Sequence, residues 1–474
     1  MPLFHVFLLS LLYALTRIPF LRPYPVYYDS FEYVRIIEKI NWSSLHSFIT
    51  TSHQPVHTLY FIICLIFKSL FPSLSTPLGM VLSSLFFGYG TCIIWYFVLR
   101  KIRNKKIALW GAIILLLFPY FFITNTNILY ESELLFFQLA AFFILLIGNE
   151  KKKERYIFFS GIVLGLAHLV FIGTAYIVPI FLGFIWGGFS RKKWYGFVGL
   201  ALFCIGYCLS GILLDFFILQ SVPLLQVKYV KHVGDVVSQN QGLILMGGRM
   251  IRNVLVQVVA ILSPGGAILL VFSALYLLIK KRVGILVIVA LLFIPFFILM
   301  QYWHAGFFGR LAIGIIFPAS FLIVLFFDSP IAHIAKIVVL LIFFISIPWR
   351  QLDPPPLYAS FYQIQNDKNI AVITSDYHRF LYEEAHIPYF AIKGDTDPKE
   401  IQQYIDSALS QKVVLIDSAA LRYPYYQYDG DTYHILSVRT DGTPLIKNIL
   451  ERYRFTEYNS VAYSDLFFLK IEKK

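Results

Sequence analysis

The sequence predicts an α-helical polytopic membrane protein with about eleven transmembrane helices, followed by a small C-terminal α/β domain. The composition is the first reason. Of 474 residues, 58% are hydrophobic and only 14% are charged, which is far less charge than a soluble chain carries. The second reason is that apolar runs of about twenty residues, the length needed to cross a bilayer, recur up to residue 350. Beyond that point the chain becomes polar.

Short basic clusters between the apolar runs predict the orientation. An even number of runs separates each cluster from the next, so all the clusters fall on one face, which the positive-inside rule makes cytoplasmic. We therefore expect a multi-pass protein with its C-terminal domain outside. The membrane is the plasma (inner) membrane or that of the endoplasmic reticulum, and the absence of an obvious retention signal favours the former. The clusters are 100–106, 151–155, 191–193 and 280–282, and the runs lie near 3–20, 53–71, 76–99, 107–124, 128–148, 157–171, 173–189, 194–217, 254–279, 283–300, 308–327 and 331–348.

The net charge of +13 does not indicate a nucleic-acid partner. The basic residues are gathered in short clusters beside apolar runs, where they set topology and meet anionic lipid headgroups. The four cysteines lie in apolar segments and show no metal-binding or disulfide spacing. The bilayer is the partner that composition predicts.

Segment 53–71 decides on which side the first polar loop lies. It opens with His53, Pro55 and His57 and contains Lys68, and polar groups of this kind are costly in hydrocarbon. An interfacial helix is therefore favoured, which places the first loop outside. If the segment crossed the bilayer instead, that loop would be cytoplasmic.

The composition predicts two domains, a transmembrane domain over 1–350 and an extracytoplasmic α/β domain over 351–474. Consecutive prolines at 354–356 form a stiff exit from the last span. In the second domain, the apolar stretches 369–374, 412–416 and 467–471 read as strands. A helix is expected over 398–409, with Asp397 as its cap.

The first polar loop carries an acidic pair, Asp29 and Glu32. In a helix, residues three apart are neighbours, so one carboxylate can act as general base for an acceptor hydroxyl while the other positions the acceptor. The pair also fits a helix-capping pattern, and the two interpretations are compatible. Carboxylate oxygens are suitable ligands for Mg²⁺ or Mn²⁺, so the sequence leaves open whether a divalent cation is a cofactor. No residues are predicted as a metal site.

Further candidates for substrate binding lie near water-facing ends of apolar runs. His53 and His57 open segment 53–71, and Glu133 opens the run after residue 127. Each also has a purely structural interpretation. The histidines can be amphipathic side chains at the membrane interface, and Glu133 can be a favourable charge at a helix N-terminus. Arg310, Lys231 and Arg249 lie on the predicted external side and can bind a donor phosphate, or serve as surface charges.

The order of these motifs resembles the polytopic, lipid-phosphosugar-dependent glycosyltransferases of the GT-C superfamily, in the branch of protein O-mannosyltransferases and aminoarabinose transferases. The resemblance rests on an N-terminal span, an external D-x-x-E-Y, an H-x-P and four later stretches. The D-x-x-E-Y motif is Asp29–Tyr33 and the H-x-P motif is His53–Pro55. The four later stretches are the basic loop 100–106, Ser132-Glu133, Gly161–Ala167, and Gly309-Arg310 with Pro318.

The resemblance implies roles for individual residues. Asp29 would be the base that activates the acceptor, Glu32, His53 and Glu133 would line the same cavity, and Arg310 would hold the donor phosphate. The chain departs from the family pattern at two positions: Phe171 stands where an Arg is usual, and Ser30 stands where some members have a second acid.

The expected function is therefore inverting transfer of a sugar from a polyprenyl-phosphate carrier to a protein, lipid or glycan acceptor on the outer face. The alternatives are a transporter or flippase of lipid-linked saccharides, and a non-catalytic subunit of a glycosylation complex. Transporters often show repeated halves, and no internal repeat is visible here.

Overall fold

A computed structural model describes most of the chain as two compact units, Met1–Pro348 and Trp349–Lys474, which are treated separately below. The described residues are 2–21, 28–45, 57–188, 193–214, 248–282, parts of 284–293, 313–327, 341, 360–375 except 362, 379–392, 396–417, 420, 425–429, 432–437, 452–458 and 468–474.

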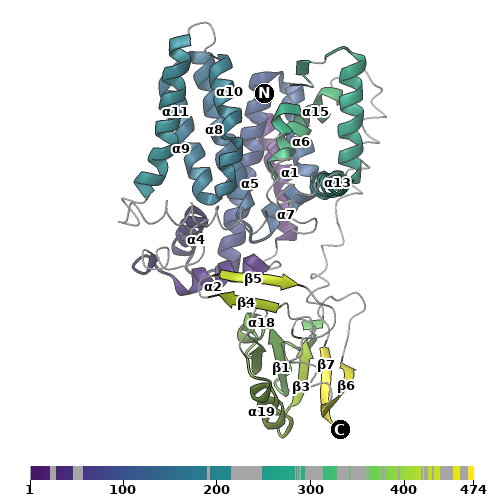
Figure 1. The fold of residues 1–474 in the computed structure, drawn as a ribbon. Coiled ribbons are helices and arrows are strands. Elements are labelled where there is room, and N and C mark those ends of the chain that lie inside the picture. The colour runs from purple at the N-terminus through teal and green to yellow at the C-terminus, as the bar shows by residue number, and fades with distance from the viewer. Residues whose placement is uncertain are drawn as a thin grey trace. The chain divides into compact units, whose positions relative to one another are not determined.

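The first unit is helical throughout its described part (Figure 1). Four of its helices are long and apolar enough to span a membrane, namely those containing Leu3–Phe20, Thr76–Ile102, Glu131–Lys151 and Ile261–Ile279, and a bent pair could form a fifth span. The predicted count of about eleven spans is not confirmed by these residues.

The helices are α1 (Pro2–Arg17), α2 (Tyr28–Lys39), α4 (Thr58–Leu70), α5 (Thr76–Ile102), α6 (Lys105–Leu117), α7 (Pro119–Thr126), α8 (Glu131–Lys151), α9 (Glu154–Val170), α10 (Val178–Gly188), α11 (Lys193–Leu214), α13 (Gly248–Ile279) and α15 (Ile316–Phe327), with short 3₁₀ segments at Ile18–Phe20, Ile172–Ile177 and Ile313–Ile315.

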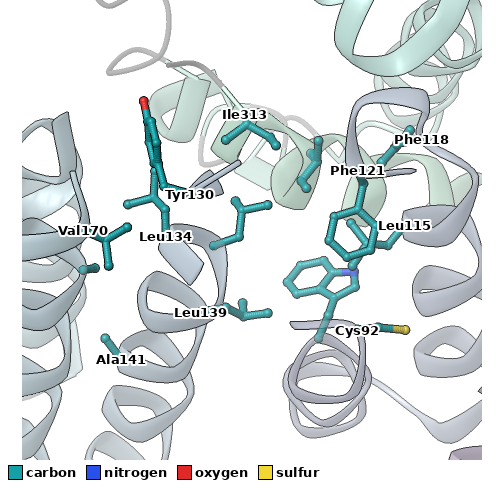
Figure 2. Packing of buried hydrophobic residues seen from close by; sticks show 14 of the residues in the cluster. Cys92, Leu115, Phe118, Phe121, Tyr130, Leu134, Leu139, Ala141, Val170 and Ile313 are labelled. Carbon is teal, nitrogen blue, oxygen red and sulfur yellow. The ribbon is translucent and has the colours of Figure 1, made fainter. Parts of the chain in front are cut away.

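The apolar run 107–124, expected as one straight span, is broken between α6 and α7 by a bend of 69°. Pro119 lacks an N–H and cannot continue the helical hydrogen bonds. Phe118 N donates to Leu115 O at 3.3 Å, which closes the last turn of α6. The guanidinium of Arg17 is buried and donates to Leu116 O at 2.7 Å, so a positive charge caps the C-terminus of α6. Figure 2 shows Phe118 and Phe121 close to Leu115 at this bend.

Helix α13 is also interrupted, at Ser263 and Pro264. Ser263 has φ 69°, outside helical geometry, and its hydroxyl accepts a hydrogen bond from Gly266 N at 3.1 Å. The hydroxyl thereby satisfies one of the N–H groups that begin the second segment. The predicted run 254–279 is therefore two helical pieces in one element.

Contacts between helix ends show which ends lie together. An ion pair between Lys101 and Glu150 joins the C-terminal ends of α5 and α8. Asn149 Nδ2 donates to Phe184 O at 3.1 Å, which brings the end of α10 to the end of α8. The ring of Trp186 lies 5.3 Å from that of Phe197 at the start of α11. These ends flank the basic clusters 100–106 and 151–155, which therefore share one end of the unit.

Helix α4 lies at the opposite end, beside α2 (Figure 1). It has 13 residues, or about 20 Å at 1.5 Å per residue, whereas the hydrocarbon core is about 30 Å thick. His57 at its start contacts Val170 O at the far end of α9, and Lys68 near its end donates to Ile37 O of α2 at 2.7 Å. Both ends of α4 therefore contact the same end of the unit, as an interfacial helix would.

The second unit contains a five-stranded sheet with the order β2-β1-β3-β7-β6 and a separate pair, β4-β5. Strands β1, β2 and β3 are parallel, and β7 and β6 complete the sheet in antiparallel fashion. The three predicted strands are present as β1, β3 and β7, shifted by about one residue, and Asp397 caps α19 as expected by accepting from Lys399 N at 2.9 Å. The elements are β1 (Ile370–Ser375), α18 (Arg379–Glu384), β2 (Tyr389–Ile392), α19 (Pro398–Leu409), β3 (Val413–Asp417), β4 (Tyr425–Asp429), β5 (Thr432–Ser437), β6 (Tyr453–Tyr458) and β7 (Phe468–Lys473).

Candidate functional site

Helix α2, which carries the acidic pair, is anchored to the turn before α8. Ser30 is fully buried, and its Oγ donates to Ile128 O at 2.7 Å. Asp29 precedes Ser30 in the first turn of α2, where the helix dipole favours a carboxylate. Glu32 follows in the same helix, and the side chains of both acids lie outside the described part of the structure. The backbone of the acidic pair is thus held beside the start of α8.

The first turn of α8 buries two carboxylates, Glu131 and Glu133. Ser83 of α5 donates to Glu133 Oε1 at 2.6 Å, while Glu133 Oε2 has no hydrogen-bond partner among the described residues. An acid within a membrane domain is costly and usually marks a functional site. Glu133 is therefore a strong candidate for a role beyond helix capping.

The start of α8 is braced by hydroxyl groups from two elements. Ser84 of α5 donates to Leu129 O at 3.1 Å. Ser132 donates to Thr124 O at 2.9 Å and to Asn125 Oδ1 at 2.8 Å, both in α7. This bracing follows from the bend at Pro119, because α7 turns away from the axis of α6 and meets α8.

His57 is buried in a stack of aromatic rings at the same end of the unit. Its Nδ1 lies 2.8 Å from Val170 O, and because a carbonyl only accepts, Nδ1 carries the proton. The ring centroid of Tyr130 is 4.1 Å away at an interplanar angle of 30°, and Tyr33 of α2 meets the imidazole edge-on at 5.6 Å. His57 thereby links α4 to α2, α8 and α9.

Phe171 occupies the position where the resemblance led us to expect an arginine. Its ring stacks on Tyr130 at 5.4 Å and lies nearly parallel to His57 at 6.0 Å. The position adds an aromatic surface to the stack in place of a positive charge.

The structure brings together only some of the predicted site residues. His57, Glu133 and the helix that carries Asp29 and Glu32 share one end of the first unit. Arg249 lies in α13 with its side chain outside the described part. His53, Lys231 and Arg310 lie wholly outside the described residues.

Sequence reasoning missed Ser83 and Tyr130 as parts of this region. The consecutive hydroxyls Ser83 and Ser84 within an apolar run were the available signal, since a hydroxyl inside a span usually has a polar partner. Tyr130 gave no such signal, because aromatic residues at membrane interfaces are common. Among the described side chains, no group of three or more His, Cys, Asp and Glu is arranged to hold a metal ion.

Comparison with known proteins indicates the family that this chain resembles. A family model of dolichyl-phosphate-mannose-protein mannosyltransferases matches residues 53–209, which include His57, Glu133 and Phe171. No protein of curated function matches the sequence.

Several solved structures share the fold at low sequence identity. ArnT from Cupriavidus metallidurans bound to undecaprenyl phosphate is 9% identical, with a TM-score of 0.58 over 98% of this chain and 97% of that chain. The apo state of the same ArnT is 10% identical, with a TM-score of 0.56 over the same shares of the two chains. The Archaeoglobus fulgidus oligosaccharyltransferase tethered to an acceptor peptide is 13% identical, with a TM-score of 0.50 over 96% of this chain and 79% of that one.

Both neighbours are GT-C glycosyltransferases, so the resemblance predicted from the sequence is confirmed, and so is the predicted fold class. The chain is an integral membrane protein with the fold of the GT-C glycosyltransferases.

Proposed function

We propose that this protein transfers a sugar from a polyprenyl-phosphate carrier to an acceptor on the extracytoplasmic face, with Asp29 as the general base. The observation that carries the proposal is the hydrogen bond from Ser30 to Ile128 O. It holds the helix of Asp29 beside buried Glu133 and the His57 stack, at the end opposite the basic clusters 100–106 and 151–155. If those clusters are cytoplasmic, this end faces outward.

The fold neighbours support a lipid-linked donor. The structure of ArnT contains undecaprenyl phosphate, and an archaeal oligosaccharyltransferase structure contains dolichol-phosphate and an inhibitory peptide, with a TM-score of 0.50. By analogy, the donor here is a sugar on a polyprenyl phosphate, and the acceptor is a protein, lipid or glycan with a free nucleophile.

In the proposed step, the Asp29 carboxylate takes the proton of an acceptor hydroxyl as that oxygen attacks the anomeric carbon. The bond from this carbon to the phosphate oxygen breaks, its electron pair leaves with the phosphate, and the configuration inverts. Arg310, Lys231 and Arg249 are the candidates for stabilising the phosphate. Glu32, Glu133, His53 and His57 would position the acceptor and the sugar. Because the phosphate leaves readily, the protein mainly supplies positioning and charge.

The test compares Asp29→Asn with Glu38→Gln, which alters an exposed acid on the same helix. Both proteins are reconstituted in liposomes with a panel of polyprenyl-phosphate sugars, and free polyprenyl phosphate and glycosylated acceptor are measured. A general base contributes about 10²–10⁴ in rate, so Asp29→Asn should lose at least about 100-fold while Glu38→Gln keeps full activity. Full activity of Asp29→Asn would refute the assignment of the base.

The same liposomes separate transfer from transport. A transferase releases polyprenyl phosphate and consumes acceptor, whereas a flippase moves the intact donor between leaflets without breaking the phosphosugar bond. Translocation without cleavage, in a preparation whose acceptors cover all three classes, would overturn the proposed function.

A further inference from the structure

The basic clusters 100–106 and 151–155 meet at one end of the first unit, where an ion pair joins them. Lys101 near the end of α5 pairs with Glu150 near the end of α8. None of the lysines and arginines in the two clusters is fully buried, and Glu154 is the one acid within them. Because the pair with Lys101 neutralises Glu150, little negative charge remains to balance the cations. Together they form one surface of strong positive charge, called the basic surface below.

Helix stability does not account for several of these cations. Lys152 ends α8 with φ 50°, in the left-handed region where glycine or asparagine is favoured. Arg155 lies in the first turn of α9, and Lys105 and Lys106 open α6, whose first turn contains no acid. Cations at a helix N-terminus oppose the helix dipole. The positive charge is therefore present at a cost to the local backbone, which indicates a partner of negative charge.

Two of the cations converge on one aromatic ring at the start of α9. The Nζ atom of Lys151 lies 5.4 Å from the ring centroid of Tyr156, and Cζ of Arg155 lies 5.2 Å from it. Like charges gathered around one ring repel each other, and a bound anion offsets that repulsion. The positive-inside rule accounts for the sign of these charges but not for their convergence. A guanidinium beside an ammonium is an arrangement that suits a phosphate group.

Exposed aromatic side chains beside the cations place the basic surface at the level of lipid headgroups. Phe159 follows Arg155 by four residues, so the two side chains are neighbours on α9, and Phe159 is 51% exposed. Trp186 is 43% exposed near the end of α10, which a hydrogen bond from Asn149 holds beside the end of α8. Exposed rings of this kind mark the interface between membrane and water. A soluble phosphate has no apolar part to cover them, whereas a phospholipid does.

We propose that the basic surface is a binding site for anionic phospholipids, with Lys151 and Arg155 at the phosphate and Phe159 along the first part of an acyl chain. Composition alone predicts only a diffuse attraction of basic residues to anionic headgroups. The convergent cations and the neighbouring exposed ring make this a specific, saturable site. Because the basic surface lies at the end of the unit opposite α2, lipid binding here does not depend on Asp29 or on sugar transfer.

The experiment titrates the full-length protein in detergent with phosphatidylglycerol or phosphatidylcholine and counts bound lipids by native mass spectrometry. We expect saturable binding of phosphatidylglycerol, at least about tenfold tighter than that of phosphatidylcholine, because only the former carries a net negative charge. Lys151→Gln combined with Arg155→Gln should weaken phosphatidylglycerol binding at least about fivefold. The matched control combines Lys280→Gln with Lys281→Gln, which removes the same charge from another exposed cluster and should keep wild-type affinity.

Thermal unfolding of each variant shows whether it has folded, and Arg155→Gln alone replaces the double variant if the latter has not. Equal loss of affinity in the two double variants would overturn the proposal, because the attraction would then follow total charge. Equal affinity of the wild type for the two lipids would overturn it as well. Displacement of phosphatidylglycerol by an equal concentration of glycerol 3-phosphate would instead assign the basic surface to a soluble phosphate.

Discussion

The hydroxyl of Ser83 on α5 lies 2.6 Å from Oε1 of Glu133 on α8, and both residues are fully buried. Ser83→Ala removes the side-chain hydroxyl that donates to this carboxylate. Leaving a buried polar group unsatisfied costs about 1–3 kcal/mol, and more for a charged one. We expect lower thermal stability in detergent together with reduced transfer activity. Glu133→Gln in the Ser83→Ala background is the control, since neutralising the acid should recover part of the lost stability.

Arg17 should stabilise the broken helix pair α6–α7. Its guanidinium caps Leu116 O and lies 5.0 Å from the ring centroid of Phe122. Arg17→Met fills similar space but leaves the carbonyl unpaired, and should lower the free energy of unfolding by about 1–3 kcal/mol. Arg22→Met, at the next arginine along the chain, is the control variant for this measurement of unfolding. Equal unfolding temperatures for wild type and Arg17→Met would contradict the capping role.

The interface between α9 and α11 should not tolerate a methyl group at Gly165. A Cβ there would lie 1.8 Å from Ser210 Oγ and 2.5 Å from Tyr207 O, and the latter is backbone that cannot rotate away. Gly165→Ala should destabilise the protein by about 1–3 kcal/mol, the usual cost of overpacking. Gly183→Ala is the matched control, because nothing lies within 4 Å of a Cβ at Gly183. Equal thermal stability of the two variants would show that the helices separate more easily than the packing implies.

The C-terminal unit should lose stability at high pH. Burial, with a hydrogen bond to Asp406, raises the pKa of Tyr453 from 10.0 to about 12. A pKa raised on folding means that the neutral phenol is favoured, so this stability is complete below pH 10 and is lost as pH rises through 12. Tyr453→Phe should show a smaller loss between these values, followed by tyrosine fluorescence. A loss identical to that of the wild type would exclude this tyrosine as the cause.

The rate of transfer in EDTA should stay within about twofold of the rate without it. A carboxylate that acts as general base uses its lone pair to take the proton and does not need a bound metal ion. Asp29 and Glu32 are three residues apart in α2, a spacing that oxygen ligands of Mg²⁺ or Mn²⁺ can also use. Loss of activity in EDTA, with recovery on adding either ion, would instead make the pair metal ligands.

The sequence predicted the helical class, the strands β1, β3 and β7 and the Asp397 cap, because these depend on local patterns of apolar and capping residues. It did not predict β2, β4, β5 or β6. It did not predict the bend at Pro119. Residues 107–124 are apolar on both sides of the proline, and membrane helices often contain proline without such a break.

For the candidate site, the sequence predicted individual polar residues but not their contacts. Asp29, Glu32, His57 and Glu133 stood out because acids and histidines are rare at the ends of apolar runs. The partner of Glu133 was not predictable, because Ser83 is 50 residues away and nothing local links the two. The Tyr130–Phe171 stack likewise depends on the tertiary packing of α8 against the end of α9.

Helix α4 is fastened at His57 to the end of α9 and at Lys68 to α2. It therefore connects the end of α9 directly to the helix that carries Asp29. Lipids with longer or shorter acyl chains change the tilt of spanning helices. A change in the tilt of α9 would reach α2 through α4, so we expect the rate of the proposed transfer to vary with the thickness of the surrounding bilayer.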